Sequence, residues 1–367
     1  MQTTDVLLSI RKLKKYFPVR KKSIFQREKQ YLRANDCISL DIKKGETFGL
    51  VGESGSGKST FGRTVLQLHK PTEGEVVYYG VDELERIPAP VKRANNGVEL
   101  TELSASEMRK LRKDLQIIFQ DPYSSLDPRM TVGQLIEEGV VIHGGYKKGS
   151  KELAVYVQEV MERCGLRADM MHRYPHQFSG GQRQRISIAR ALAVKPKFVV
   201  CDECVSALDV SIQSQILNLL TDLKEREGLT YLFISHDLSV VRYVSDRIGV
   251  MYLGQIVEQG ETEEIFKNPR HPYTIALISA IPKMERKKGG QILLQGNMPS
   301  PVSPPSACRF HTRCFMAQEI CKRVPAPIVE VEEGHFVACH FAEKSTREKR
   351  KIAQENQIGE DCQQNIK

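Results

Sequence analysis

The stretch "GESGSGKST", residues 52–60, is the part of the sequence that decides the fold. It fits the phosphate-loop pattern G-x-x-x-x-G-K-S/T, in which backbone N–H groups converge on phosphate oxygens at the positive end of the following helix. The required context is present, because "ISLDIKKGETFGLV" at 38–51 predicts a strand pair and "KSTFGRTVLQLHK" at 58–70 predicts a helix. We therefore expect the loop to bind the phosphates of a nucleotide. The loop residues predicted to do so are Gly52, Ser54, Gly55, Gly57, Lys58, Ser59 and Thr60.

Two side chains of this loop and two acidic residues far downstream form a candidate hydrolytic site. The loop pattern gives Lys58 contact with the β- and γ-phosphates and gives the Ser59 hydroxyl to Mg²⁺. Asp202 ends the apolar run "KFVVCDE", 197–203, so we expect it to hold Mg²⁺ through water. Glu203, one residue further, points elsewhere and is predicted to orient or deprotonate an attacking water. Because apolar strands alternate with helices, the sequence indicates a parallel α/β sheet.

A second glycine-rich segment stands at the start of a predicted helix. It suggests that the chain has a second phosphate-binding site. "FSGGQ" at 178–182 precedes the strongly helical "QRQRISIARAL" at 182–192, which is a second place suited to an anion. The chain's own loop already encloses its own nucleotide from one side. We therefore expect Ser179, Gly180, Gly181 and Gln182 to contact the nucleotide of a second subunit, in a head-to-tail pair.

Taken together, these motifs resemble the ATP-binding cassette (ABC) superfamily across about residues 5–260. The resemblance implies ATP as the nucleotide and an α/β P-loop NTPase core with a mixed sheet and a helical subdomain. It implies that Gln120 of "FQDP" and His236 of "ISHD" serve catalysis, with Gln120 also touching the metal. It further implies that Asp209 of "SALD" contacts nucleotide across the pair and that Phe17 of "KKYFPV" stacks on adenine, with Tyr16 as the alternative. The family usually has Pro where this chain has Cys204. The resulting C-x-x-C is interpreted as accidental.

Composition and charge indicate which partners and which cellular location are compatible with the sequence. The 367 residues carry a formal net charge of +9, which fits anionic partners as well as a solvated basic surface. No apolar run approaches the roughly 18 residues of a membrane span. The charges of the N-terminal "MQTTDVLLSIRKLKKYF" follow its apolar stretch, which is the wrong order for a secretory signal. We therefore expect a cytosolic protein, and the family resemblance implies a peripheral position on the cytoplasmic face of the inner membrane.

The C-terminal part adds two features. "HPYTIALISAIP" and "PSPVSPPSACRFHTRC" resemble the extension on ATP-binding subunits of oligopeptide and dipeptide importers, whose relatives also import nickel or oligosaccharides. Four cysteines follow, Cys308, Cys314, Cys321 and Cys339. Their spacing and the family resemblance favour a 4Fe–4S cluster. Zinc, with His311, His335 or His340 as substitute ligands, and unligated cysteines remain the alternatives.

These observations predict the organisation and function of the chain. The expected parts are a nucleotide-binding domain at 1–254 (helical subdomain about 121–189), an extension with the four-cysteine cluster at 255–342, and a polar, disordered tail at 343–367. We expect an ATPase that drives uptake of oligopeptides or dipeptides. Its expected partners are a second, paralogous ATPase subunit, a membrane permease and, indirectly, an extracytoplasmic solute-binding protein, with no nucleic acid. The alternative is a soluble cassette ATPase acting on nucleic acid or ribosomes.

Overall fold

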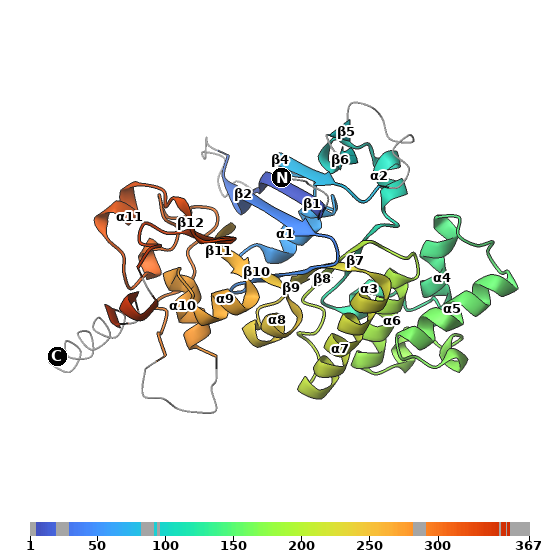
Figure 1. Cartoon of the computed structure of the whole chain (residues 1–367). Coiled ribbons are helices and arrows are strands. Elements are labelled where there is room, and N and C mark those ends of the chain that lie inside the picture. The colour runs from blue at the N-terminus through green and yellow to red at the C-terminus, as the bar shows by residue number, and fades with distance from the viewer. Residues whose placement is uncertain are drawn as a thin grey trace.

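The computed structural model describes residues 5–19, 29–81, 92–93, 96–281, 291–344, 346–349 and 351–352 (Figure 1). Two β-sheets form the centre of the molecule. A group of helices (green) and the C-terminal extension (orange to red) lie on opposite sides of this centre in Figure 1. The predicted α/β class with a mixed sheet is confirmed. Within the described ranges, no helix is long and apolar enough to cross a membrane.

The larger sheet has eight strands in the order β12-β13-β11-β10-β3-β9-β8-β7. Strands β10, β3, β9, β8 and β7 run parallel, whereas β11, β13 and β12 are added antiparallel. Every residue of β3, β8 and β9 is buried, because other elements cover both faces of this part of the sheet. The strands are β3 (Thr47–Val51), β7 (Leu115–Ile118), β8 (Phe198–Asp202), β9 (Thr230–Ile234), β10 (Arg247–Tyr252), β11 (Gln255–Glu261), β12 (Ile328–Glu332) and β13 (His335–Ala338).

The smaller sheet has five antiparallel strands in the order β2-β1-β4-β6-β5. Phe61 and Val65 of helix α1 are fully buried in one apolar cluster with residues of both sheets, so α1 ties the two sheets together. Part of the predicted insertion at 84–101 contributes β5 and β6, while residues 82–91 and 94–95 lie outside the described residues. The elements are β1 (Val6–Pro18), β2 (Tyr31–Lys43), β4 (Glu73–Tyr78), β5 (Lys92–Arg93), β6 (Gly97–Glu99) and α1 (Lys58–Val65).

Helices pack around the larger sheet in a second apolar cluster. Val157 of α5, Ile186 of α6 and Ile216 of α7 are all fully buried in it. The helices are α2 (Ala105–Leu111), α3 (Pro122–Ser125), α4 (Val132–Ile142), α5 (Lys151–Arg163), α6 (Gly180–Leu192), α7 (Val210–Glu227), α8 (Leu238–Val244), α9 (Thr262–Lys267), α10 (Pro272–Ser279) and α11 (Glu319–Arg323). Short 3₁₀ turns are η4 (Leu100–Glu102), η5 (Ala168–Met170), η6 (Pro175–Gln177) and η7 (His311–Arg313).

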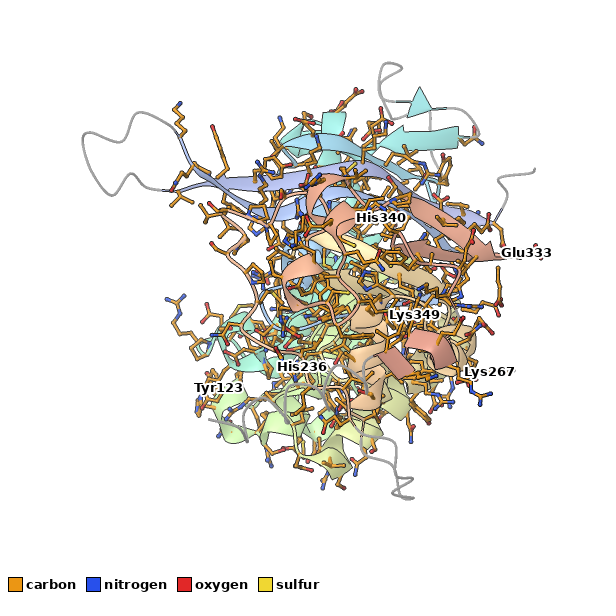
Figure 2. The ribbon with its side chains drawn as sticks, turned by 90° about the vertical axis from the view of Figure 1, so that its left-hand side faces the viewer. Tyr123, His236, Lys267, Glu333, His340 and Lys349 are labelled. Atoms are coloured by element: carbon orange, nitrogen blue, oxygen red, sulfur yellow. The ribbon has the colours of Figure 1, made fainter. Side chains whose placement is uncertain are left out.

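The C-terminal extension shares the larger sheet with the core. Gly254, the predicted last residue of the nucleotide-binding domain, is in the tight turn between β10 and β11, and β13 pairs with β11. Lys349, labelled in Figure 2, donates from Nζ to the carbonyl oxygens of Arg270 and Ala342, so residues 346–349 pack against the body. Residues 353–367 of the predicted tail lie outside the described residues.

An aromatic cluster joins the extension to the core. The Phe310 ring is 5.1 Å from Tyr252 of β10 and 5.4 Å from Tyr273 of α10, measured between ring centroids, and it is 1% exposed. Truncating such a side chain leaves a cavity, so we expect Phe310→Ala to lower the free energy of unfolding by about 3–5 kcal/mol. Urea denaturation measures this, with the less buried Phe341→Ala as the matched control. Equal losses in the two variants would contradict a special role for the cluster.

Candidate functional site

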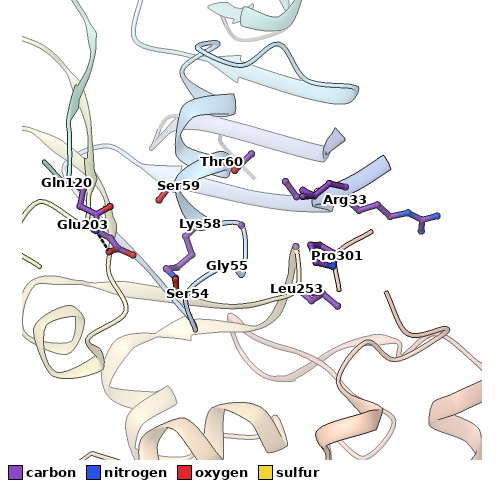
Figure 3. A pocket seen from close by; sticks show the side chains of 14 residues that line it. Arg33, Ser54, Gly55, Lys58, Ser59, Thr60, Gln120, Glu203, Leu253 and Pro301 are labelled. Carbon is purple, nitrogen blue, oxygen red and sulfur yellow. Dashed lines mark hydrogen bonds between the residues drawn. The ribbon is translucent and has the colours of Figure 1, made fainter. Parts of the chain in front are cut away.

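A pocket of about 460 Å³ opens where the phosphate loop, β2 and the β10–β11 turn meet. Figure 3 shows Gln120 and Glu203 at one end, Lys58 and Ser59 in the middle, and Arg33, Leu253 and Pro301 at the other end. The structure thus brings together residues from sequence-distant segments around the predicted loop. The lining residues are Leu32, Arg33, Ala34, Ser54, Gly55, Gly57, Lys58, Ser59, Thr60, Gln120, Glu203, Leu253, Gly254 and Pro301.

The phosphate loop requires glycine at its two ends. Gly52 and Gly57 have φ angles of 150° and 105°. A Cβ at Gly52 would lie 2.1 Å from the Met251 carbonyl oxygen, and one at Gly57 would lie 2.1 Å from that of Ala34. A side chain at either position would therefore force backbone to move.

The Lys58 ammonium group lies folded over this loop. Its Nζ donates to the Gly52 carbonyl at 2.7 Å and to the Glu53 carbonyl at 3.0 Å. Burial lowers the pKa of Lys58, while the nearby carboxylates of Glu203, Asp202 and Glu53 act in the opposite direction. The group is thus a positive centre inside the cradle, as the loop pattern predicts.

Asp202, the predicted magnesium ligand, is buried at the end of β8 and does not itself line the pocket. Its carboxylate is almost fully buried, and its Oδ2 accepts from Arg63 at 3.2 Å. Its Oδ1 has no hydrogen-bond partner in the described part of the chain, which leaves one oxygen free to bind a hydrated cation. The other predicted ligands, Ser59 and Gln120, both line the pocket. Bound there, Mg²⁺ would supply positive charge that neutralises the phosphate oxygens.

Glu203 stands at the centre of three predicted catalytic side chains. Its Oε2 accepts from Gln120 Nε2 at 3.0 Å and lies 3.3 Å from His236 Nδ1. Its φ of 50° is left-handed, and the turn is held by its own N–H donating to the Ile234 carbonyl at 3.0 Å. The three residues follow β8, β7 and β9, whose carboxyl ends share one edge of the sheet. A carboxylate held by an amide and an imidazole is arranged to orient a water and accept its proton.

The C-x-x-C pair beside Glu203 is part of the core. Cys201 and Cys204 are 0% and 1% exposed. A hydrogen bond with the Cys204 thiol, together with burial, raises the pKa of the Cys201 thiol. A protonated, buried thiol is a poor nucleophile and a poor metal ligand, in line with the interpretation of this pair as accidental.

The second glycine-rich segment caps helix α6 on the molecular surface. Ser179 Oγ accepts from the Gln182 N–H at 3.3 Å, while Gln182 Oε1 accepts from the Ser179 N–H at 3.1 Å. Ser179 and Gly180 are exposed, and neither lines the pocket formed by the chain's own phosphate loop. Asp209 similarly caps α7, accepting from the Ile212 N–H at 3.0 Å. These residues do not meet the chain's own site, and their predicted contact with a second subunit's nucleotide stays a prediction.

Gly181 has a structural role that the sequence did not reveal. A Cβ there would lie 2.5 Å from Cγ2 of Ile212, so the glycine lets α6 approach α7 closely. The only sequence signal was the glycine itself, which is equally consistent with a ligand contact.

The predicted adenine-stacking residue does not line the pocket. Phe17 packs edge-to-face with His69, their ring centroids 5.5 Å apart, and Lys15 lies over the ring. Tyr16, the alternative, donates from its hydroxyl to Asp36 Oδ1 at 2.5 Å. Desolvation by burial, with this hydrogen bond, raises the pKa of Tyr16 to about 12. The residues that do line this end, including Leu32, Arg33 and Pro301, carry no local motif that sequence reasoning could use.

The predicted cluster of four cysteines is not supported by the structure. Within the described ranges, no three His, Cys, Asp or Glu side chains converge as metal ligands. Burial raises the pKa of Cys308, Cys314 and Cys339.

The histidines of the zinc alternative have other partners. His335 Nε2 lies 2.8 Å from Glu258 Oε1, and His340 Nε2 donates to the Val324 carbonyl at 3.0 Å. His311 Nδ1 lies 2.8 Å from the Cys308 carbonyl oxygen. The expectation of a 4Fe–4S or zinc centre formed by Cys308, Cys314, Cys321 and Cys339 is therefore not supported by the described part of the chain.

Comparisons with known proteins agree with the fold and the pocket. The family described as "ABC transporter" matches residues 36–206, and "Oligopeptide/dipeptide transporter, C-terminal region" matches residues 257–321. The chain is 48% identical over 342 residues to the oligopeptide transport ATP-binding protein AppF of Bacillus subtilis strain 168, covering 92% of this chain and 98% of that protein. It is 46% identical over 335 residues to the dipeptide transport ATP-binding protein DppF of Haemophilus influenzae, covering 91% and 96%.

Solved structures confirm the predicted cassette fold. The ATP-binding cassette MJ0796, described as dimeric in a post-hydrolysis state bound to ADP and Pi, is 28% identical with a TM-score of 0.58. The match covers 70% of this chain and 99% of that one. The protein cbiO1 of Clostridium perfringens, part of the transporter complex cbiONQ, is 26% identical with a TM-score of 0.57, covering 72% and 91%.

Proposed function

This chain belongs to the ABC transporter family of oligopeptide and dipeptide transport ATP-binding proteins, and from that premise we propose that it is the ATP-hydrolysing subunit of a peptide importer. The observation that carries the proposal is the convergence of Lys58, Glu203 and Gln120 on one pocket. The two relatives reported above are transport proteins by name and do not support the alternative of a cassette ATPase acting on nucleic acid or ribosomes.

Hydrolysis is divided among the described side chains. Lys58 and the loop amides would hold the β- and γ-phosphates, and Ser59, Gln120 and Asp202 would hold Mg²⁺, which supplies positive charge to the phosphate oxygens. Glu203 orients the attacking water and accepts its proton, and His236 holds the Glu203 carboxylate in place from the end of β9. Phe17 remains the proposed adenine-stacking residue.

The proposed working unit is a head-to-tail pair of ATPase subunits, the second one a paralogue. Support comes from the exposed start of α6 and from the dimeric state named for the solved cassette MJ0796. In this pair, Ser179, Gly180, Gly181, Gln182 and Asp209 of each subunit face the partner's nucleotide. Closure completes each site and excludes water other than the attacking one.

The helical part of the chain is the proposed contact with the permease. Tyr123 of α3, labelled in Figure 2, is 65% exposed, and the Arg183 guanidinium of α6 stacks over its ring at 4.0 Å. This aromatic lies three residues after Gln120, so movement at the nucleotide reaches it through a short segment. We place the protein on the cytoplasmic face of the inner membrane, bound to a permease that receives peptide from an extracytoplasmic binding protein. The proposed boundaries remain 1–254, with helical subdomain about 121–189, then 255–342 and 343–367.

The test is peptide uptake by proteoliposomes containing the co-purified permease, this chain and its partner ATPase. We expect ATP-dependent accumulation of a labelled peptide in the presence of the binding protein. Lys58→Met should abolish it, because the loop loses its phosphate-binding cation. ATP hydrolysis that is stimulated by RNA and indifferent to permease and peptide would contradict the proposal.

A further inference from the structure

The C-terminal extension contacts the chain's ATP site at two places, the pocket lining and the phosphate loop. Pro301 lines one end of the pocket beside Arg33 and Leu253 (Figure 3), and its carbonyl accepts the Arg33 N–H at 3.0 Å. The Arg309 guanidinium, 7% exposed on its side chain, donates to the Leu253 carbonyl and the Asp36 carboxylate. These contacts hold residues 301–309 of the extension against β2 and the β10–β11 turn, the two segments that form this end of the pocket.

The second place is inside the phosphate loop itself. Arg313 of η7 makes a two-pronged ion pair with Glu53, Nη1 to Oε2 at 2.9 Å and Nη2 to Oε1 at 3.2 Å. The Arg313 side chain is 7% exposed and that of Glu53 is 28% exposed. The Glu53 N–H also donates to the hydroxyl of the buried Tyr273 at 2.9 Å. Both the side chain and the backbone of the second loop residue are therefore held by the extension.

The negative charge of Glu53 gives this contact an electrostatic effect on the ATP site. Lys58 Nζ donates to the Glu53 carbonyl oxygen at 3.0 Å, so Glu53 lies in the part of the loop over which the Lys58 side chain folds. An uncompensated carboxylate at this position would compete with phosphate for Lys58 and would repel a triphosphate. The Arg313 guanidinium neutralises the Glu53 carboxylate, and its two hydrogen bonds to that carboxylate also restrict the conformation of the loop.

We propose that the extension is a working part of the ATP site, in which Arg313 positions the phosphate loop and neutralises Glu53 while Pro301 closes the opposite end. Arg313 is a positioning residue, since it acts on nucleotide through Glu53. The inference rests on the proposed ATPase function but on no property of the transported solute. It gives the C-terminal region a role in nucleotide affinity.

The test measures binding of a fluorescent ATP analogue and steady-state ATPase kinetics on the full chain with its partner subunit. For Arg313→Met we expect the dissociation constant and KM for ATP to rise about tenfold with kcat unchanged, because Glu203, Gln120 and His236 are untouched. Arg313→Lys, which keeps the charge without the fork, should lose less. Adding Glu53→Gln to Arg313→Met should restore most of the affinity, since the repelling carboxylate is gone.

Arg270→Met is the matched control. Arg270 pairs with Glu332 at 2.9 Å within the extension, and neither residue belongs to the phosphate loop or contacts Glu53. This variant should keep wild-type affinity, whatever its melting temperature. Unchanged affinity in Arg313→Met, or no rescue by Glu53→Gln, would overturn the inference. Failure of the wild-type protein to bind the analogue would instead overturn the proposed ATPase function, so the two failures are distinguishable. Should Arg313→Met not fold, Arg313→Lys decides: affinity below wild type supports the inference, and unchanged affinity overturns it.

Discussion

Replacing Glu203 by Gln is expected to slow ATP hydrolysis by about 10²–10⁴-fold while ATP still binds. The amide has the same size as the carboxylate, and its oxygen can still accept from Gln120, so the geometry at the end of β8 is preserved. What it lacks is the ability to take a proton from water. The phosphate loop, whose Lys58 and Ser59 hold the nucleotide, is unchanged.

Phosphate release measures the rate, and fluorescence of a bound nucleotide analogue measures the affinity. Glu263→Gln is a suitable control, because Glu263 is an exposed carboxylate that pairs with Arg242 at 2.8 Å, outside the pocket. It should hydrolyse ATP at the wild-type rate. If Glu203→Gln kept half of the wild-type rate with unchanged affinity, Glu203 would not be the general base. A loss of affinity as large as the loss of rate would point to a distorted loop.

The catalytic end of the pocket could be predicted from the sequence because each residue sits in a short local pattern. Gln120, Glu203 and His236 each follow an apolar run that folds as a strand, and parallel strands bring their carboxyl ends to one edge. Predicting that these three residues share one site therefore required only the order of the strands in the sheet, which the family resemblance implied. The hydrogen bonds among the three residues follow from that placement.

The other end of the pocket depends on long-range packing and carries no such pattern. Arg33, Leu253 and Pro301 come from β2, the β10–β11 turn and the C-terminal extension, which are far apart in the sequence and meet through backbone hydrogen bonds to β2. The ion pair of Glu53 with Arg313 spans 260 residues. No spacing rule connects such partners. The four cysteines illustrate a different limit, since their spacing suggested a metal centre that the described part of the chain does not support.

An Asp in place of Gly180 is expected to cut ATP hydrolysis on the order of a hundredfold without weakening ATP binding to a single subunit. Gly180 is the first residue of α6, its backbone φ is not left-handed, and the nearest atom to an added Cβ is Leu208 Cδ2 at 3.8 Å. The fold thus accepts a side chain here. A carboxylate at a helix N-terminus is even favourable for the isolated subunit, so stability should hold or rise slightly.

The loss would come from the partner. In the proposed pair the start of α6 faces the γ-phosphate of the other subunit, and a carboxylate there repels it and blocks closure. Lys151→Asp places the same residue at the same first position of α5 and should leave hydrolysis unchanged. Light scattering with ATP, using Glu203→Gln to prevent turnover, should show pairs in the single variant and monomers once Gly180→Asp is added. Full hydrolysis by Gly180→Asp, or equal turnover by a strictly monomeric preparation, would refute the shared site. Such a result would confine catalysis to the one pocket that Lys58 and Glu203 already line.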